Sequence, residues 1–280
     1  MSYLVSIDWL KEQLEKQRDD LAVVDVRFSL ADPDKGRRAY EQGHIPGAMY
    51  LDLNRDLSGQ VAEHGGNHPL PDIDVFAEKL GEIGIDQQTT VVIYDEKNDM
   101  FAARLWWLLD YLGHKQTYLL DGGFSRWVER GNVSTTAISI PTLKVFNPAV
   151  EKEKMVDINQ VKERIKDRSA VLVDSRSKDR YLGKTEPMYA KAGHIPSAKN
   201  FFWKDVLEEN GQWKNEAALQ TNFKNLSKDD EIIVSCGSGV SACPNIIGLK
   251  MAGYKNVKLY PGSYSDWISY GENQVETKDE

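Results

Sequence analysis

The sequence predicts an α/β protein built from two tandem domains, each a parallel sheet flanked by helices. The length of 280 residues exceeds that of most single domains. Unusual strings recur in the same order in both halves of the chain, and short apolar strands alternate with helices within each half. Such alternation is typical of a parallel sheet that helices cover on both faces.

Four pairs of matching strings, roughly 140 to 150 residues apart, define the repeat. They are VVDVR at 23–27 with VLVDSR at 171–176, QGHIPGA at 42–48 with AGHIPSA at 192–198, VVIYD at 91–95 with IIVSC at 232–236, and LDGGFSRW at 120–127 with YPGSYSDW at 260–267. Matches in a single order indicate that one domain was duplicated. We therefore predict a first domain over residues 1–135, a linker over 136–155 and a second domain over 156–280.

The individual helices and strands follow from capping residues and apolar spacing. In the first half, Ser6 is suited to cap a helix over 7–17, Asp72 is suited to cap one over 73–83, and residues 102–112 form a strongly apolar helix. The second half predicts helices over 157–166, 216–226 and 242–251, and a buried strand over 231–235. Between the halves the pattern is lost and the chain becomes charged, which is typical of a surface linker.

Composition limits the classes of protein to which the chain can belong. An apolar content of 41% fits a soluble globular protein, and a net charge of -8 offers no basic surface for nucleic acid or an anionic membrane. The N-terminal residues lack a signal sequence and no stretch is long enough to span a membrane, so we expect a cytoplasmic protein. The two cysteines, Cys236 and Cys243, are too few for a secreted disulfide framework.

The most specific chemical feature is the string CGSGVSA at 236–242, which joins a predicted strand to a predicted helix. Gly237 and Gly239 let the backbone curl until successive N–H groups point to one centre, and the helix N-terminus adds partial positive charge. Such a cradle stabilises a sulfur anion at Cys236. The alternative is that Cys236 is one of the many small, buried and inert cysteines.

The duplication is asymmetric at this position. Asp95 stands at the strand end that corresponds to Cys236, and the loop after it has one extra residue. We therefore expect the first domain to be a non-catalytic copy.

The sequence resembles the two-domain sulfurtransferases of the rhodanese family, and the resemblance covers nearly the whole chain. It rests on CGSGVSA, DSRSKDRYLG at 174–183, both GHIP turns, DLSGQVAEHGGNHPLPD at 56–72 and DGGFSRW at 121–127. In that family, thiosulfate enzymes tend to carry a basic Cys-Arg-Lys-Gly loop, whereas 3-mercaptopyruvate enzymes carry Cys-Gly-Ser-Gly or Cys-Gly-Thr-Gly. The present loop is of the second kind.

The resemblance implies that Cys236 takes a sulfane sulfur from 3-mercaptopyruvate as a persulfide and passes it to a thiol or to cyanide. A thioredoxin-like protein is the acceptor that family analogy suggests. Thiosulfate remains the alternative donor, although its two negative charges call for more positive charge than Gly237 and Ser238 provide. A persulfide carrier with little turnover of small donors remains the alternative outside the enzymes.

The family also implies which residues bind the donor. Arg180 lies where the family places a substrate-binding arginine, and its structural alternative is an ion pair with Asp179 or Glu186. The loop backbone would hold the donor through Gly237, Gly239, Val240 and Ser241. A second arginine that mercaptopyruvate enzymes usually carry shortly before GHIP is missing, because Met188 and Tyr189 stand in that stretch.

A Ser-His-Asp relay has been proposed for mercaptopyruvate enzymes, and Ser238, His44 and Asp25 are taken as its counterparts here. A second interpretation is structural, because His194 and Asp174 recur at the matching turn and strand of the other half. One cause, maintenance of the fold, then explains both copies. Ser238 has no such counterpart.

Other chemistries fit the sequence less well. A cysteine phosphatase needs an arginine six positions after its cysteine, where Ala242 stands. Zinc-ligand spacing is absent around the two cysteines, and the glycines of the loop do not follow a dinucleotide fingerprint, so we expect no metal and no cofactor. Cys243 opens the predicted helix and is expected to pack in the core, the alternative being a disulfide with Cys236 that would require the loop to rearrange.

Overall fold

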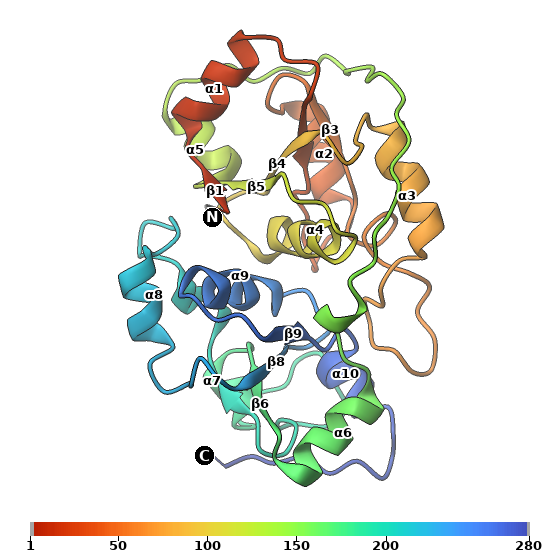
Figure 1. Cartoon of the computed structure of the whole chain (residues 1–280), viewed down its shortest axis with the longest axis vertical. Helices are drawn as coiled ribbons and strands as arrows, with labels where there is room; N and C mark the ends of the chain where they lie inside the picture. The colour runs from red at the N-terminus through yellow and green to blue at the C-terminus, as the bar shows by residue number, and fades with distance from the viewer. Residues whose placement is uncertain (1–2, 279–280) are drawn as a thin grey trace. The chain divides into compact units, whose positions relative to one another are not determined.

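A computed structural model describes residues 3–278 and divides the chain into two compact units (Figure 1). Unit 1 contains the chain up to Gly59, then Pro71–Glu151 and Glu208–Trp213. Unit 2 contains Gln60–Leu70, Lys152–Leu207 and the chain from Lys214 onward. Each unit holds one parallel sheet with helices against it, which confirms the predicted fold class.

Within the described residues, unit 1 has a five-stranded parallel sheet in the order β1-β5-β4-β2-β3. Its strands are β1 (Leu4–Val5), β2 (Leu21–Asp25), β3 (Ala48–Tyr50), β4 (Thr90–Tyr94) and β5 (Thr117–Leu120). Its helices are α1 (Ile7–Glu15), α2 (Lys35–Gln42), α3 (Ile73–Glu82), α4 (Met100–Tyr111) and α5 (Gly123–Glu129). The side chains of Ser6 and Asp72 cap α1 and α3, as the sequence predicts.

Unit 2 has a four-stranded parallel sheet in the order β7-β6-β8-β9. Its strands are β6 (Ala170–Asp174), β7 (Lys199–Asn200), β8 (Glu231–Ser235) and β9 (Val257–Leu259). Its helices are α6 (Ile158–Asp167), α7 (Lys178–Tyr181), α8 (Glu216–Asn222), α9 (Cys243–Met251) and α10 (Ser263–Trp267), with short 3-10 turns at Lys152–Lys154 and Trp203–Val206. The central strand β8 leads directly to Cys236 at the carboxyl edge of the sheet.

Apolar side chains on the strands and helices form a separate core in each unit. In unit 1 the core includes Leu10, Val23, Val92, Leu120 and Trp127, and in unit 2 it includes Val161, Leu172, Ile233, Tyr264 and Trp267. The matching tryptophans of the repeat therefore occupy matching core positions. None of the helices in the described part of the chain has the length and apolar character that crossing a membrane requires.

The units differ from the predicted domains at three segments. Residues 136–151, expected as a linker, belong to unit 1, where the backbone N–H of Lys144 donates to Gly81 and that of Ala149 donates to Leu112. Residues 208–213 also belong to unit 1, because Trp213 donates its backbone N–H to Asp121. Residues 60–70 belong to unit 2. Apolar periodicity along the chain cannot predict to which unit these three segments belong, because that depends on contacts with residues distant in sequence.

Helix α8 ends at Asn222, four residues before its predicted end. The hydroxyl of Tyr254 lies 2.8 Å from the carbonyl oxygen of Phe223 and 3.0 Å from that of Leu226. The N–H of Lys224 donates to Thr221 and that of Leu226 donates to Phe223, so residues 223–226 form turns with i→i−3 hydrogen bonds and do not continue the α-helix.

Candidate active site

Cys236 lies at the end of β8 with its backbone held on both sides and its side chain buried, at 1% exposure. Its N–H donates to the hydroxyl of Ser263 at 3.0 Å, and its carbonyl accepts the N–H of Tyr264 at 3.0 Å. The thiol is not part of a disulfide. The strand end therefore fixes the position of the sulfur atom.

The loop after Cys236 curls tightly around the cysteine, and residues 237–240 are buried. Gly239 has a φ of 77°, and a Cβ atom there would lie 2.3 Å from the carbonyl oxygen of Pro261, so only glycine fits. Within residues 3–278, no protein acceptor receives the N–H groups of Gly237, Ser238, Val240 and Ser241. Helix α9 begins directly after the loop and adds its partial positive charge. Buried N–H groups without acceptors are rare in proteins, and here they form a ready anion site.

The equivalent turn in unit 1 carries a carboxyl group at the position of the thiol. Asp95 follows β4, and its carboxyl group accepts the N–H of Asp99 at 2.8 Å and the N–H of Ala102 at 2.9 Å. Burial, with the nearby negative charge of Asp99, raises the pKa of Asp95 to about 8. The first copy therefore fills its cradle with its own side chain. The second copy has the shorter cysteine side chain at this position.

Ser238 is hydrogen-bonded to His68, a residue that was not predicted from the sequence. Its Oγ lies 2.7 Å from Nδ1 of His68, and both residues are buried. The hydroxyl and the imidazole together provide a path for a proton beside Cys236. Ser238 thus has a histidine partner within unit 2, and this partner is not the histidine of the expected relay.

Residues 64–68 reach Ser238 because they dock on α10. The N–H of Gly65 donates to Asp266 at 2.7 Å, and the N–H of Asn67 donates to the hydroxyl of Ser265 at 3.1 Å. The ring of His64 stacks on Tyr270 with 4.0 Å between ring centroids. These three contacts hold the segment in place and so fix the position of His68.

His44 and Asp25 have structural partners in unit 1, which supports the structural interpretation of these two residues. Nδ1 of His44 lies 2.8 Å from the carbonyl oxygen of Tyr40, and Nε2 lies 3.2 Å from that of Ala137. Asp25 accepts hydrogen bonds from Arg27, the shortest at 2.7 Å, and within residues 3–278 no hydrogen bond joins it to His44. Both ring nitrogens face backbone oxygens, so the imidazole holds the GHIP turn in place.

The second copy repeats this arrangement. Nδ1 of His194 lies 2.7 Å from the carbonyl oxygen of Tyr181, and the two rings stack at 3.7 Å. Asp174 accepts from Arg176 at 2.6 Å. The repetition of these contacts in a domain with different chemistry assigns them to the fold. His68 has no counterpart in the second half of the sequence, and this was the signal that could have identified it.

Arg180 takes part in a buried group of charges next to the loop. Its Nη2 lies 2.8 Å from Oε1 of Glu186, and Nη1 of Arg176 lies 3.1 Å from Oε2 of the same carboxylate. Arg176 also pairs with Asp174, so two cations and two anions balance one another. The predicted alternative of an ion pair with Glu186 is therefore present. Nη1 of Arg180 has no hydrogen-bond partner among residues 3–278.

Cys243 lies at the first turn of α9 and is fully buried. Its Sγ lies 3.4 Å from the carbonyl oxygen of Gly239, to which the thiol can donate. It forms no disulfide and packs under the loop. In the described part of the chain, no group of three or more His, Cys, Asp or Glu side chains is placed to hold a metal ion.

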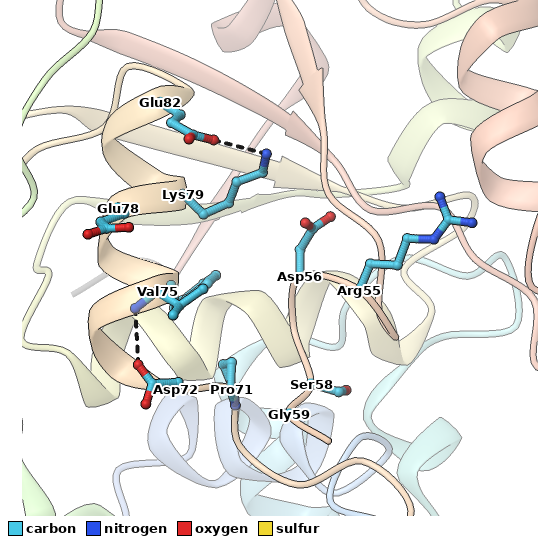
Figure 2. Close-up of a pocket in the computed structure, with 11 residues that line it drawn as sticks. Arg55, Asp56, Ser58, Gly59, Pro71, Asp72, Val75, Glu78, Lys79 and Glu82 are labelled. Carbon is cyan, nitrogen blue, oxygen red and sulfur yellow. Dashed lines mark hydrogen bonds and ion pairs between the residues drawn. The ribbon is translucent and has the colours of Figure 1, made fainter. Parts of the chain in front are cut away.

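A second concave feature lies in unit 1, between residues 55–59 and helix α3, and has a volume of about 340 Å³ (Figure 2). Among its charged groups, Lys79 pairs with Glu82 at 3.1 Å and Asp72 caps α3. No cysteine or histidine is among the residues that line it. It therefore offers no nucleophile for sulfur chemistry.

The chain is similar to known proteins over most of its length. The rhodanese-like domain family matches residues 6–130 and 157–270. The chain is 39% identical to a probable 3-mercaptopyruvate sulfurtransferase from Pseudomonas aeruginosa, with 93% of each chain covered. It is 32% identical to thiosulfate sulfurtransferase from Cricetulus griseus, with 95% of this chain and 91% of the relative covered.

Among solved structures, SseA from Escherichia coli, described as a 3-mercaptopyruvate sulfotransferase, matches with a TM-score of 0.84 and 30% identity. The match covers 95% of this chain and 100% of that chain. The chain belongs to the rhodanese family of two-domain sulfurtransferases.

Proposed function

We propose that the protein transfers a sulfane sulfur from 3-mercaptopyruvate to a thiol or to cyanide through a persulfide on Cys236. The observation that supports this most directly is the loop around Cys236, where the N–H groups of Gly237, Ser238, Val240 and Ser241 have no protein acceptor among the described residues. These groups can stabilise the thiolate before the reaction and the persulfide anion after it. A fixed strand end keeps the sulfur in that position.

In the first half of the cycle, the Cys236 thiolate attacks the sulfur of 3-mercaptopyruvate. An S–S bond forms, the bond between carbon 3 and sulfur breaks, and its electron pair goes to carbon 3. The thiol proton of the donor ends on that carbon, which gives pyruvate and leaves the persulfide on the enzyme. No external oxidant or reductant is needed. In the second half, the acceptor attacks the outer sulfur and the Cys236 thiolate returns.

Ser238 and His68 are proposed to move the proton in the first half-reaction. Their hydrogen bond of 2.7 Å joins a hydroxyl in the loop to an imidazole held by the 64–68 segment. The serine hydroxyl can donate to the donor's oxo group or to carbon 3 while the imidazole replaces its proton. Gly237, Gly239, Val240 and Ser241 line the same loop and would contact the donor through their backbone.

Electrostatics favour a donor with a single negative charge. The charges of Arg176, Arg180, Asp174 and Glu186 cancel, so the site provides hydrogen-bond donors without a net positive field. The cost of removing an ion from water rises steeply with its charge, and a dianion needs more compensation than a monoanion. Thiosulfate is the second candidate donor, favoured by the similarity to the thiosulfate sulfurtransferase of Cricetulus griseus.

A thiol, for example that of a thioredoxin-like protein, is the acceptor that we propose. We also propose a cytoplasmic location, because a nucleophilic thiol must remain reduced between turnovers and both cysteines are free. Exchange between a persulfide and a thiol needs only an attacking thiolate, which a reducing compartment supplies.

The test compares pyruvate release from 3-mercaptopyruvate with sulfite release from thiosulfate, with a thiol acceptor present, in the wild type and in Cys236→Ser. Dominant pyruvate release that disappears in the variant, together with a mass gain of one sulfur atom on Cys236, is the expected result. Dominant sulfite release would favour thiosulfate as the donor. Persulfide formation with turnover of neither donor would favour a carrier.

A further inference from the structure

Tyr189 lies against the first residue of the loop that follows Cys236. Its hydroxyl oxygen is 2.6 Å from the position that a Cβ atom on Gly237 would occupy. The ring is held edge-on by Tyr264, with 5.8 Å between centroids, and packs against the core of unit 2. The tyrosine thus occupies a fixed place at the entrance to the loop.

The hydroxyl of Tyr189 is a hydrogen-bond donor that the protein does not use. Across residues 3–278, no side chain or backbone group forms a hydrogen bond with it, whereas the hydroxyls of Tyr181, Tyr254 and Tyr264 donate to backbone carbonyls. Burial, followed by the negative charge of Cys236, raises the pKa of Tyr189. The group therefore stays protonated at neutral pH and keeps its proton available for a ligand.

Arg180, which packs over the ring of Tyr189, carries a second unused donor. The centre of its guanidinium lies 5.3 Å from the ring centroid of Tyr189. Glu186 receives bonds from Nε and Nη2 of Arg180, which leaves Nη1 unbonded within the described residues. One neutral O–H and one N–H of an ion-paired arginine therefore lie together near the loop.

We propose that Tyr189 is a specificity-determining residue, whose hydroxyl donates a hydrogen bond to an oxygen of the 2-oxo acid donor while Nη1 of Arg180 binds its carboxylate. This inference rests on the proposed function. A neutral hydroxyl at this place recognises an oxygen atom without adding positive charge. It therefore favours a monoanionic 2-oxo acid over a dianion, which would gain more from a cation.

The test uses Tyr189→Phe, Tyr189→Arg and a matched control, Tyr254→Phe, which removes a hydroxyl bonded to backbone at Phe223 and Leu226. kcat and KM are measured for both donors, and the dissociation constant of 3-mercaptopyruvate is measured in the Cys236→Ser background. Loss of one hydrogen bond to the donor is expected to lower kcat/KM for 3-mercaptopyruvate about tenfold to a hundredfold in Tyr189→Phe. The value for thiosulfate should change far less, and Tyr189→Arg should raise it.

Gly237→Ala provides a second measurement of the same geometry. The new methyl group would lie 2.6 Å from the Tyr189 hydroxyl and would displace it. The nearest ring carbons would lie at 3.4 Å, so the ring itself could stay in place. Gly237→Ala should therefore lower kcat/KM for 3-mercaptopyruvate strongly in the wild-type background. In the Tyr189→Phe background it should cost little more, because the displaced hydroxyl is already gone.

The outcomes separate this inference from the proposed function. A wild type that releases sulfite but no pyruvate would overturn the proposed function and this inference with it. The inference alone would be overturned if the wild type releases pyruvate and Tyr189→Phe has the same kcat/KM values as Tyr254→Phe. It would also be overturned if Tyr189→Phe lowers kcat/KM equally for both donors.

Discussion

At the scale of single residues, the difference between the two units depends on what stands at the end of the central strand. Both positions bond the chain in the same way: the carbonyl of Asp95 accepts the N–H of Phe124, and that of Cys236 accepts the N–H of Tyr264. The carboxyl group of Asp95 reaches the loop N–H groups and occupies them. Cysteine is shorter and leaves them to a ligand. The side chain at this position therefore decides whether the loop N–H groups are occupied by the protein, as in unit 1, or are available to a ligand, as in unit 2.

The buried carboxyl of Asp95 should make stability depend on pH. Burial raises its pKa to about 8, whereas an Asp in the unfolded chain has a pKa of about 4. At low pH both states are protonated, and as pH rises towards 8 the unfolded chain loses this proton first. Unfolding therefore becomes easier over this range. We expect thermal midpoints measured from pH 5 to pH 8 to fall more in the wild type than in Asp95→Asn.

The exposed Asp19→Asn variant is the control for the change in net charge. If Asp95→Asn and Asp19→Asn follow the wild-type midpoints equally across the pH range, the buried carboxyl does not carry the effect.

At the scale of elements, strands and helices were predicted closely where their signals are local. The strand over 231–235 is found with the predicted bounds, and the caps at Ser6 and Asp72 begin helices as expected. Helix α8 was predicted too long because the chain after Asn222 turns with i→i−3 hydrogen bonds, and the hydroxyl of Tyr254, distant in sequence, bonds the carbonyls of this turn. The same limit applies to the site. No pattern in the sequence around His68 predicts that its segment packs against α10.

The docked segment around His68 gives a prediction at this scale. Gly66 has a φ of 83°, and a Cβ atom there would lie 2.5 Å from the carbonyl oxygen of Gly262. Gly66→Ala should push the segment away from α10 and shift His68 relative to Ser238. A misplacement of about 1 Å can reduce catalysis about a hundredfold. We expect a loss of pyruvate release on that order, with little change in the far-ultraviolet circular dichroism.

Gly65→Ala is a matched control, since Gly65 also has a positive φ, 96°, but nothing lies within 4 Å of its Cβ position. Equal losses in the two variants would attribute the effect to backbone strain and would contradict the docking argument.

At the scale of the whole molecule, the internal repeat was sufficient to predict two parallel sheets and the cysteine at the end of a central strand. It also predicted a structural role for His44, because His194 recurs in the second GHIP turn, whereas the relay was an expectation from the family resemblance. Both ring nitrogens of His44 lie near backbone oxygens, in agreement with the structural role. Repetition reports what both domains need in order to fold. The residues that distinguish the reactive unit, His68 and Tyr189, lie where the halves do not match, so an argument from repetition passes over them.

This contrast between repeated and unrepeated residues can be tested with two histidine variants. His44→Ala removes the ring's polar contacts with two backbone oxygens and its stacking on Tyr40, so we expect the free energy of unfolding to fall by about 2 to 4 kcal/mol. The protein that remains folded should keep its kcat. His68→Ala removes the partner of Ser238 and should lower pyruvate release about a hundredfold or more, with a smaller change in the thermal midpoint. Denaturant unfolding and steady-state kinetics on the same preparations measure both effects. A large fall in kcat for folded His44→Ala, with His68→Ala close to the wild type, would return His44 to the relay and make the contact between His68 and Ser238 structural.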